Sequence, residues 1–302
     1  MGSRWRGGSL CRLATSLLAT CGLVLAGAAT ASASDYPVVY NFPVGLAESA
    51  VYPTPPGAND WSCRPTPRHP QPVVLVPGLT GSMSRDWQAA APLLANHGYC
   101  VFAYDFSSEG QEAIEPAADG LSGFVDRVIA ATGASKVDLV SHSEGGVIAR
   151  YYLEFLGGAG KTLDLVQISP LNHGTTAYGV GTLLQENGLA GPATSSICAP
   201  CGEQTAGSSF MQKLNGNGDT VPGVAYTVIA TRYEEIITPY ESQFLSGSDV
   251  HNILLQDQCS LDAVDHLASQ YDSISLQDVL NALDPAHAKA PPCHPVLPGV
   301  GG

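Results

Sequence analysis

Short apolar runs alternate with longer segments of helical periodicity along most of this chain. The apolar runs are four to eight residues long and rich in Val, Leu and Ile, which is typical of buried parallel strands. Helical spacing follows in segments near 84–97, 121–131 and 144–156. This alternation predicts an α/β fold, with a doubly wound, mainly parallel sheet and helices on both faces. The expected strands are 72–77, 100–104, 136–140, 163–168 and 224–231.

Three segments lack this periodicity. Residues 34–71 are rich in Pro, Gly and Tyr and predict an irregular arm, and residues 285–302 predict an extended Pro/Gly-rich tail. Residues 175–220 form a long insertion rich in Gly, Ser, Thr and Asn, and loops of that length in compact domains are usually functional. We therefore expect one catalytic domain over residues 34–302, with a cap or lid at 175–220.

The first 33 residues have the features of a secretion signal. Arg4, Arg6 and Arg12 form a basic start, an apolar stretch follows over 13–30, and Ala31-Ser32-Ala33 has the form of a cleavage site. A membrane anchor is the alternative, but the apolar stretch is short and ends in small residues. We expect cleavage after Ala33, an extracellular product and no integral membrane segment afterwards.

The charge balance excludes some partners. The formal charge of −14 becomes −17 when the three arginines of the signal are removed. An acidic chain without a basic cluster is a poor candidate for binding nucleic acid or anionic membrane surfaces.

Six cysteines remain after the signal, and an even number in an exported chain predicts three disulfides. Fifteen pairings are possible. The Cys198-Ala-Pro-Cys201 segment is also compatible with a redox or zinc half-site, but no second such motif accompanies it. Pairing in sequence order gives Cys63–Cys100, Cys198–Cys201 and Cys259–Cys293.

Residues 141–146, Ser-His-Ser-Glu-Gly-Gly, follow a predicted strand and precede a predicted helix. This is the pattern of a nucleophile elbow, a tight turn that lifts one serine hydroxyl above the end of a sheet. The usual form is G-x-S-x-G, and this chain has Ser141 at the first glycine position and Gly145 at the second. The motif makes Ser143 the candidate nucleophile of an acyl-transfer reaction.

A serine nucleophile needs a histidine base and an acid, and in the α/β-hydrolase order the acid precedes the histidine. Glu234 and Glu235 directly follow the strand 224–231, and spacing alone leaves both open as the acid. His251 and His266 stand in the right order for the base. We favour His266, because it lies in a loop before a helix.

The oxyanion of such a reaction is held by backbone N–H groups. One donor is expected from the residue after the nucleophile, Glu144, and the second from the loop after the first central strand. That loop is Gly78-Leu79-Thr80-Gly81, which makes Leu79 the second donor.

Together these motifs resemble the secreted class 2 lipases of bacteria, in the α/β-hydrolase superfamily. The resemblance extends from about Pro72 to Ala286, and the loops 230–240 and 264–266 are also similar to those of Candida antarctica lipase B. It implies Ser143 as nucleophile and His266 as base. It also implies Glu234 as the acid, at a position where the family usually has aspartate, with Glu235 as the alternative.

The same resemblance supports the disulfides Cys63–Cys100 and Cys259–Cys293 and implies no organic cofactor. The sequence has no clear cluster of metal ligands. It predicts a monomeric serine hydrolase for carboxylic esters, with a lipid or other ester as substrate and triacylglycerol lipase as the first expectation. The alternatives are a short-chain carboxylesterase, a polyester hydrolase, an acyltransferase with an alcohol acceptor, and a catalytically inactive binding protein of the same fold.

Overall fold

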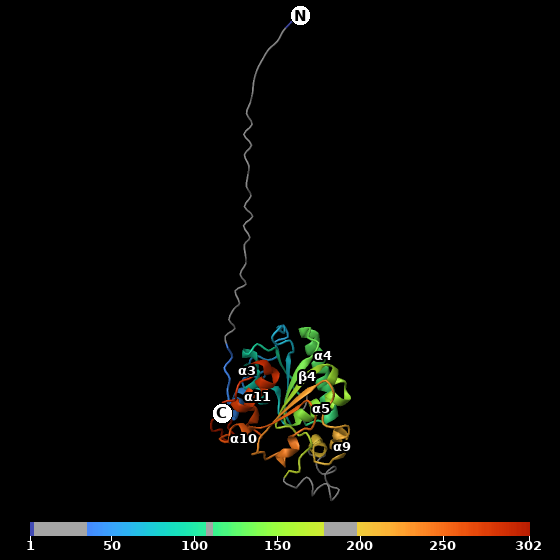
Figure 1. Ribbon diagram of the computed structural model, residues 1–302, viewed down its shortest axis with the longest axis vertical. Coiled ribbons are helices and arrows are strands. Elements are labelled where there is room, and N and C mark those ends of the chain that lie inside the picture. The colour runs from blue at the N-terminus through green and yellow to red at the C-terminus, as the bar shows by residue number, and fades with distance from the viewer. Residues whose placement is uncertain (3–34, 107–110, 178–197) are drawn as a thin grey trace. The chain divides into compact units, whose positions relative to one another are not determined.

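Six parallel strands form the centre of the fold in the computed structural model (Figure 1). The structure describes residues 1–2, 35–106, 111–177 and 198–302. Residues 3–33 of the predicted signal and 178–197 of the predicted cap lie outside the described residues. The strands are β1 (Val73–Val76), β2 (Val101–Ala103), β3 (Val137–His142), β4 (Thr162–Ile168), β5 (Ala225–Ala230) and β6 (Val250–Leu254). Their order in the sheet is β2-β1-β3-β4-β5-β6, and every pairing is parallel.

The chain reverses its direction of winding between β1 and β3. From β1 it adds β2 on one side of the sheet, and it then returns to add β3 to β6 on the other side. The loops that leave the carboxyl ends of β1 and β3 therefore diverge, and such a switch point is where α/β folds bind their ligands.

Helices cover both faces of the sheet (Figure 1). β1 shows why, because Val74 and Val76 join the apolar core on one face while Val73 and Leu75 join the core on the other. One core is covered by α4 (Ile114–Thr132), α5 (Glu144–Phe155) and α9 (Ser209–Asn215), and the other by α3 (Ala90–Asn96) and α11 (Ser273–Leu283). The doubly wound α/β architecture predicted from the alternating pattern is confirmed, and it is the α/β-hydrolase fold that the family resemblance implied.

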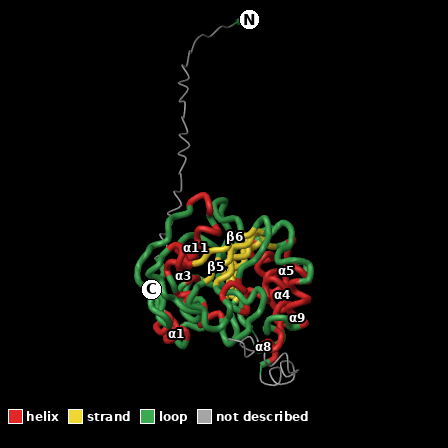
Figure 2. The backbone as a smooth tube through the Cα atoms, turned by 60° about the horizontal axis from the view of Figure 1, so that its bottom comes forward, coloured by secondary structure: helices red, strands yellow, loops and turns green. Residues whose placement is uncertain are grey.

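The remaining helices are short and lie mostly in the connections (Figure 2). No helix in the described part of the chain has the length and apolarity needed to cross a membrane. The short helices of the described residues are α1 (Phe42–Ser49), α2 (Met83–Asp86), α8 (Ala199–Glu203), α10 (Leu255–Gln258) and the 3-10 turns η1 (Gly158–Gly160), η2 (Tyr240–Gln243), η3 (Ser269–Tyr271) and η4 (Pro285–His287).

The structure differs from the expected elements in three places where tertiary contacts decide. The helix expected over 84–97 is two helices, α2 and α3, separated around the fully buried Trp87. α4 begins seven residues earlier than expected, and Glu203 of α8 accepts a hydrogen bond from the N–H of Ile114 at 2.9 Å. The arm 34–71 contains α1, in which Gly45 packs so closely on Tyr271 that a Cβ would lie 2.2 Å from its ring.

β6 is the strand that the pattern did not predict. It is one of the two edge strands of the sheet, and only Ile253 of its five residues is buried. His251 and Asn252 are exposed, so the segment carries no apolar run.

The described cysteines form three disulfides. Each pair is the one expected from sequence order, and the bonds link Cys63 to Cys100, Cys198 to Cys201 and Cys259 to Cys293. The tail beyond Cys293 returns to the domain, where Val296 is buried and the carbonyl of Val300 accepts a hydrogen bond from the N–H of Phe42 at 2.7 Å.

Candidate active site

The turn between β3 and α5 has the geometry of a nucleophile elbow. Ser143 adopts φ 53° and ψ −123°, a strained conformation for a residue with a side chain. A Cβ on Gly145 would lie 2.4 Å from the carbonyl oxygen of Val76 and 2.6 Å from that of Pro77, so only glycine fits. Ser141, at the position where the usual motif has glycine, is fully buried. Position 145 therefore accepts only glycine, whereas position 141 also accepts the small side chain of serine.

Ser143, His266 and Glu234 form a continuous chain of hydrogen bonds. Ser143 Oγ lies 2.9 Å from His266 Nε2. His266 Nδ1 lies 2.9 Å from Glu234 Oε1 and 3.0 Å from Oε2. The three residues are 5%, 3% and 6% exposed, so the chain of contacts is shielded from bulk water. The loops after β3 and β5, and the loop between α10 and η3, bring these distant positions together.

Glu234 is held as a carboxylate by the groups around it. Its Oε1 accepts hydrogen bonds from the N–H groups of Ile236 and Ile237 at 2.9 and 3.0 Å, and its Oε2 accepts one from Gln243 Nε2 at 3.1 Å. Burial by itself raises the pKa of Glu234. The charge and hydrogen bond of His266 and the two backbone donors outweigh burial and lower the pKa below its ordinary value.

Glu235 contacts the same histidine in a different way. Its Oε2 accepts a hydrogen bond from the backbone N–H of His266 at 3.1 Å and does not meet the imidazole. Burial, together with the negative charges of Asp265 and Glu234, raises the pKa of Glu235. The two neighbouring glutamates, which spacing alone could not separate, thus hold the ring and the backbone of His266 respectively.

His251, the other histidine in the right order, does not join this group. It is the second residue of the edge strand β6 and its side chain is exposed. Position in the chain alone allowed it, but it lies within a strand and not in a loop beyond a strand end.

His142 and Asp86 contact the residues of the site through the carbonyl of His266 and the N–H of Gly78, and local sequence patterns did not indicate either role. His142 Nε2 lies 3.2 Å from the carbonyl oxygen of His266, and the two imidazole rings are 5.0 Å apart. Asp86 Oδ2 accepts a hydrogen bond from the N–H of Gly78 at 2.8 Å and lies 3.6 Å from His142 Nδ1. The only signal available for His142 was its place beside Ser143.

The loop after β1 approaches Ser143 closely. A Cβ on Gly78 would lie 3.0 Å from Ser143 Cβ, and one on Gly81 would lie 2.6 Å from the Asp86 carboxylate. Leu79 is partly buried between them, and Thr80 has a positive φ of 57°. Two glycines therefore allow the loop that carries Leu79 to fit against the elbow.

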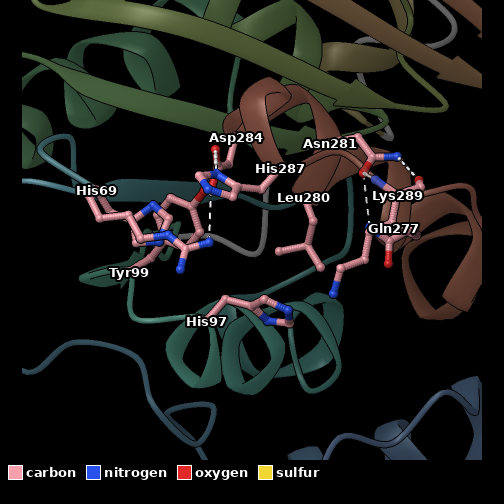
Figure 3. A pocket seen from close by; sticks show the side chains of 10 residues that line it. His69, His97, Tyr99, Gln277, Leu280, Asn281, Asp284, His287 and Lys289 are labelled. Carbon is pink, nitrogen blue, oxygen red and sulfur yellow. Dashed lines mark hydrogen bonds and ion pairs between the residues drawn. The ribbon is translucent and has the colours of Figure 1, made fainter.

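A separate cavity of about 60 Å³ lies beside Tyr99, which precedes β2 and so stands at the amino end of the sheet. Figure 3 shows His69 and Tyr99 on one side of Leu280, with Asn281 and Lys289 on the other. Asp284 is already paired there with Arg68 at 3.3 Å and with His287 at 2.8 Å. None of the residues around Ser143 lines this cavity.

Comparison with known proteins agrees with this geometry. A sequence model described as "Lipase (class 2)" matches residues 70–278, more than half of the chain. This protein belongs to the class 2 lipase family. The match includes the elbow, both glutamates and His266.

Curated relatives are similar to this chain over a shorter segment. The chain is 35% identical over 86 residues to a triacylglycerol lipase of Pseudarthrobacter phenanthrenivorans and equally identical to one of Burkholderia plantarii. Each match covers 26% of this chain, and 27% and 24% of the two relatives. The matched segment is therefore about a quarter of their length.

Solved lipase structures share the fold. Aspergillus fumigatus lipase B is 20% identical with a TM-score of 0.59, over 79% of this chain and 57% of that chain. Bacillus licheniformis lipase BlEst2 in its mature form is 18% identical with a TM-score of 0.56, over 73% of this chain and 94% of that chain. At these identities the likeness supports the architecture alone.

No group of three or more His, Cys, Asp or Glu side chains in the described ranges is arranged to hold a metal ion. The chemistry that the described groups can perform is proton transfer between the hydroxyl of Ser143 and the ring of His266.

Proposed function

We propose that this member of the class 2 lipase family is a secreted serine hydrolase that cleaves carboxylic esters, with triacylglycerols as its first substrate class. The observation that carries the proposal is the hydrogen-bonded chain Ser143–His266–Glu234 at 2.9 and 2.9 Å. A buried serine on a strained elbow, bonded to a buried imidazole that contacts a buried carboxylate, is an arrangement suited to acyl transfer.

The reaction proceeds through an acyl-enzyme. His266 Nε2 takes the proton of Ser143 while Oγ attacks the ester carbonyl, and Glu234 stabilises the imidazolium that forms. The tetrahedral intermediate collapses as His266 gives this proton to the departing alcohol oxygen. Water then enters, loses a proton to His266 and attacks the acyl group, and the acid leaves as Ser143 recovers its proton.

Leu79 and Glu144 supply the N–H groups that hold the oxyanion. Among the described residues, no hydrogen bond occupies the backbone N–H of Leu79 or of Glu144. Glu144 is the first residue of α5, so the positive end of the helix also favours a negative oxygen there. Both donors are thus available to a developing charge beside Ser143.

Triacylglycerols come first as substrates because the matched relatives are triacylglycerol lipases. A short-chain carboxylesterase or a polyester hydrolase uses the same chemistry and differs in the cap, of which residues 178–197 lie outside the described part. Export rests on the signal features of residues 1–33, and the three disulfides suit an oxidising compartment. An inactive binding protein would have no need of a complete and buried Ser–His–Glu set.

The test is hydrolysis of p-nitrophenyl esters from acetate to palmitate, with emulsified triolein, by residues 34–302 and by the Ser143→Ala variant. We expect activity on long chains and triolein that falls by several orders of magnitude in Ser143→Ala. Activity limited to short soluble esters would identify an esterase. Equal activity in the variant would exclude Ser143 as nucleophile, and no activity in the wild type would favour the binding protein.

A further inference from the structure

The carboxyl group of Glu144 is enclosed between the elbow and the predicted cap. Glu144 directly follows Ser143, and it has no exposed surface. Its Oε2 accepts a hydrogen bond from Gln204 Nε2, while its Oε1 has no hydrogen-bond partner among the described residues. Glu144, which we propose offers its backbone N–H to the oxyanion, therefore uses its side chain to bind Gln204 of the predicted cap.

Backbone hydrogen bonds to a second segment hold Gln204 in place. Gln204 is the C-cap of α8, and its carbonyl accepts a hydrogen bond from the N–H of Thr175 at 2.9 Å. The N–H of Ala206 returns a bond to the carbonyl of Thr175 at 3.0 Å. A Cβ on Gly174 would lie 2.6 Å from the carbonyl oxygen of Gln204, so the two segments are in close contact.

The same segment reaches the loop of Glu234. Thr175 Oγ1 donates to the carbonyl of Ile236 at 2.7 Å and accepts from the N–H of Thr238 at 3.1 Å. The N–H of Ile236 is one of the donors to Glu234. Gln204 of the predicted cap thus contacts the elbow through Glu144, and through Thr175 it is linked to the loop that carries Glu234.

We infer that Glu144 and Gln204 form a positioning pair, in which the side-chain contact holds the first turn of α5 against the cap and keeps the N–H of Glu144 directed at the oxyanion. The inference rests on the proposed function, because it assigns that N–H to the oxyanion. It goes further by giving the side chain of Glu144 and the cap residue Gln204 a part in the rate. Neither side chain touches the reacting atoms, so both act through the backbone of α5.

The charges around Glu144 predict that its neutral form is the active one. Burial, with the negative charges of Glu203 in α8 and Glu112 ahead of α4, raises the pKa of Glu144 to about 8, against the lowering effect of the Gln204 hydrogen bond. The neighbouring Ser143 carries His266 on its other side. Above this pKa Glu144 would carry a buried negative charge one residue from Ser143, and this charge would oppose the charge that develops on the oxyanion.

The first test is Gln204→Met, which keeps the length of the side chain and removes the amide. The matched control is Gln212→Met in α9, since Gln212 is exposed and its side-chain amide donates to the backbone carbonyl of Gly207 rather than to a side chain of the elbow. Removing an oxyanion donor costs on the order of 100-fold in kcat. Loosening one is expected to lower kcat about tenfold while KM changes less than twofold. Equal kcat in the two variants would overturn the inference.

The second test is the pH profile of kcat between pH 6 and 10. We expect an alkaline fall near pH 8 in the wild type, no such fall in Glu144→Gln, and a fall displaced to higher pH in Gln204→Met. A merely structural role would leave the shape of the profile unchanged. Glu144→Gln keeps the volume and a hydrogen-bonding group, so this test holds even where Gln204→Met fails to fold.

The proposed function and the positioning pair can be refuted separately. If Ser143→Ala retains activity, the proposed function is wrong. If Ser143→Ala is inactive but Glu144→Gln keeps the wild-type alkaline fall, the proposed function stands and the positioning pair is wrong.

Discussion

The two ends of the sheet bury carboxyl groups in opposite ways. Near the amino end, Asp138 is 3% exposed, and burial together with the negative charge of Asp164 raises its pKa to about 8. Beyond the carboxyl end, Glu234 is 6% exposed, and its pKa is lowered. Two acids of similar burial therefore prefer opposite protonation states.

Donors account for the difference. Glu234 receives the ring N–H of His266, two backbone N–H groups and the amide of Gln243. Asp138 faces a second carboxyl, and its Oδ1 has no hydrogen-bond partner in the described part of the structure. Burial penalises the charge in both places, and only the carboxyl end of the sheet supplies the groups that overcome the penalty.

The largest expected effect tests the role of that charge. Glu234→Gln keeps the shape and removes the negative charge, so His266 loses its stabilised imidazolium, and we expect kcat to fall about 10⁴-fold. Glu235→Gln is the matched control, because Glu235 bonds only the backbone N–H of His266 among these groups. We expect it to stay within about tenfold of wild type. Comparable losses in kcat for p-nitrophenyl butyrate at pH 7.5 would remove the distinction between the two glutamates.

The disulfides extend the comparison of the two ends to stability. Cys100 lies just before β2, at the amino end of the sheet, and its bond to Cys63 closes 37 residues, whereas Cys198–Cys201 closes three. Longer loops gain more from closure, so Cys63→Ala/Cys100→Ala is expected to lower the free energy of unfolding by about 3–4 kcal/mol. Cys198→Ala/Cys201→Ala should cost less than about 2 kcal/mol. Urea denaturation measures both, and a reversed order would be inconsistent with this view.

Gly145 probes the packing at the carboxyl end of β3. Gly145→Ala places a methyl group against the backbone carbonyls of Val76, the last residue of β1, and of Pro77 after it, which cannot move aside without disturbing the sheet. We expect a loss of about 2–3 kcal/mol of stability. Gly123→Ala in α4 is the control, since nothing lies within 4 Å of its new Cβ, and it should gain roughly 0.5–1 kcal/mol. Similar melting temperatures for the two variants would contradict the close approach at the elbow.

Much of the carboxyl end could be predicted from the sequence, because its signals are local. The elbow motif, the two glutamates after a strand and the order of acid and histidine are all read along the chain. The roles of Glu234 and Glu235 could not be separated by spacing, since adjacent residues differ only in where their side chains reach in space. Asp86 and Gln204 were missed for the same reason, as their partners lie 8 and 60 residues away.

The same limit of local sequence patterns applies to the secondary-structure elements. Buried strands such as β1 carry an apolar run and were predicted, while the edge strand β6 carries polar, exposed residues and was not. The early start of α4 depends on Glu203, which is 89 residues from Ile114. Local patterns therefore predicted the buried strands, including the edge strand β2, better than the mostly exposed strand β6.

The smallest expected effect on activity concerns the amino end. The pKa of Asp138 is higher in the folded chain than in the unfolded one, so the unfolded chain releases its proton first and stability falls as pH rises between the two values. Asp138→Asn removes this loss. We expect the gain in stability of the variant over wild type to grow as pH rises from 5 to 8, with kcat unchanged. A constant difference in urea midpoint across this range would rule out the raised pKa.

The most direct test of the account is to trap the nucleophile. A p-nitrophenyl alkylphosphonate reacts with an activated serine by forming a phosphorus–oxygen bond and releasing p-nitrophenol, and mass spectrometry of the digested protein locates the adduct. We expect one equivalent of p-nitrophenol and one adduct on Ser143, with no reaction in Ser143→Ala. An adduct on another residue, or equal labelling of the variant, would contradict it.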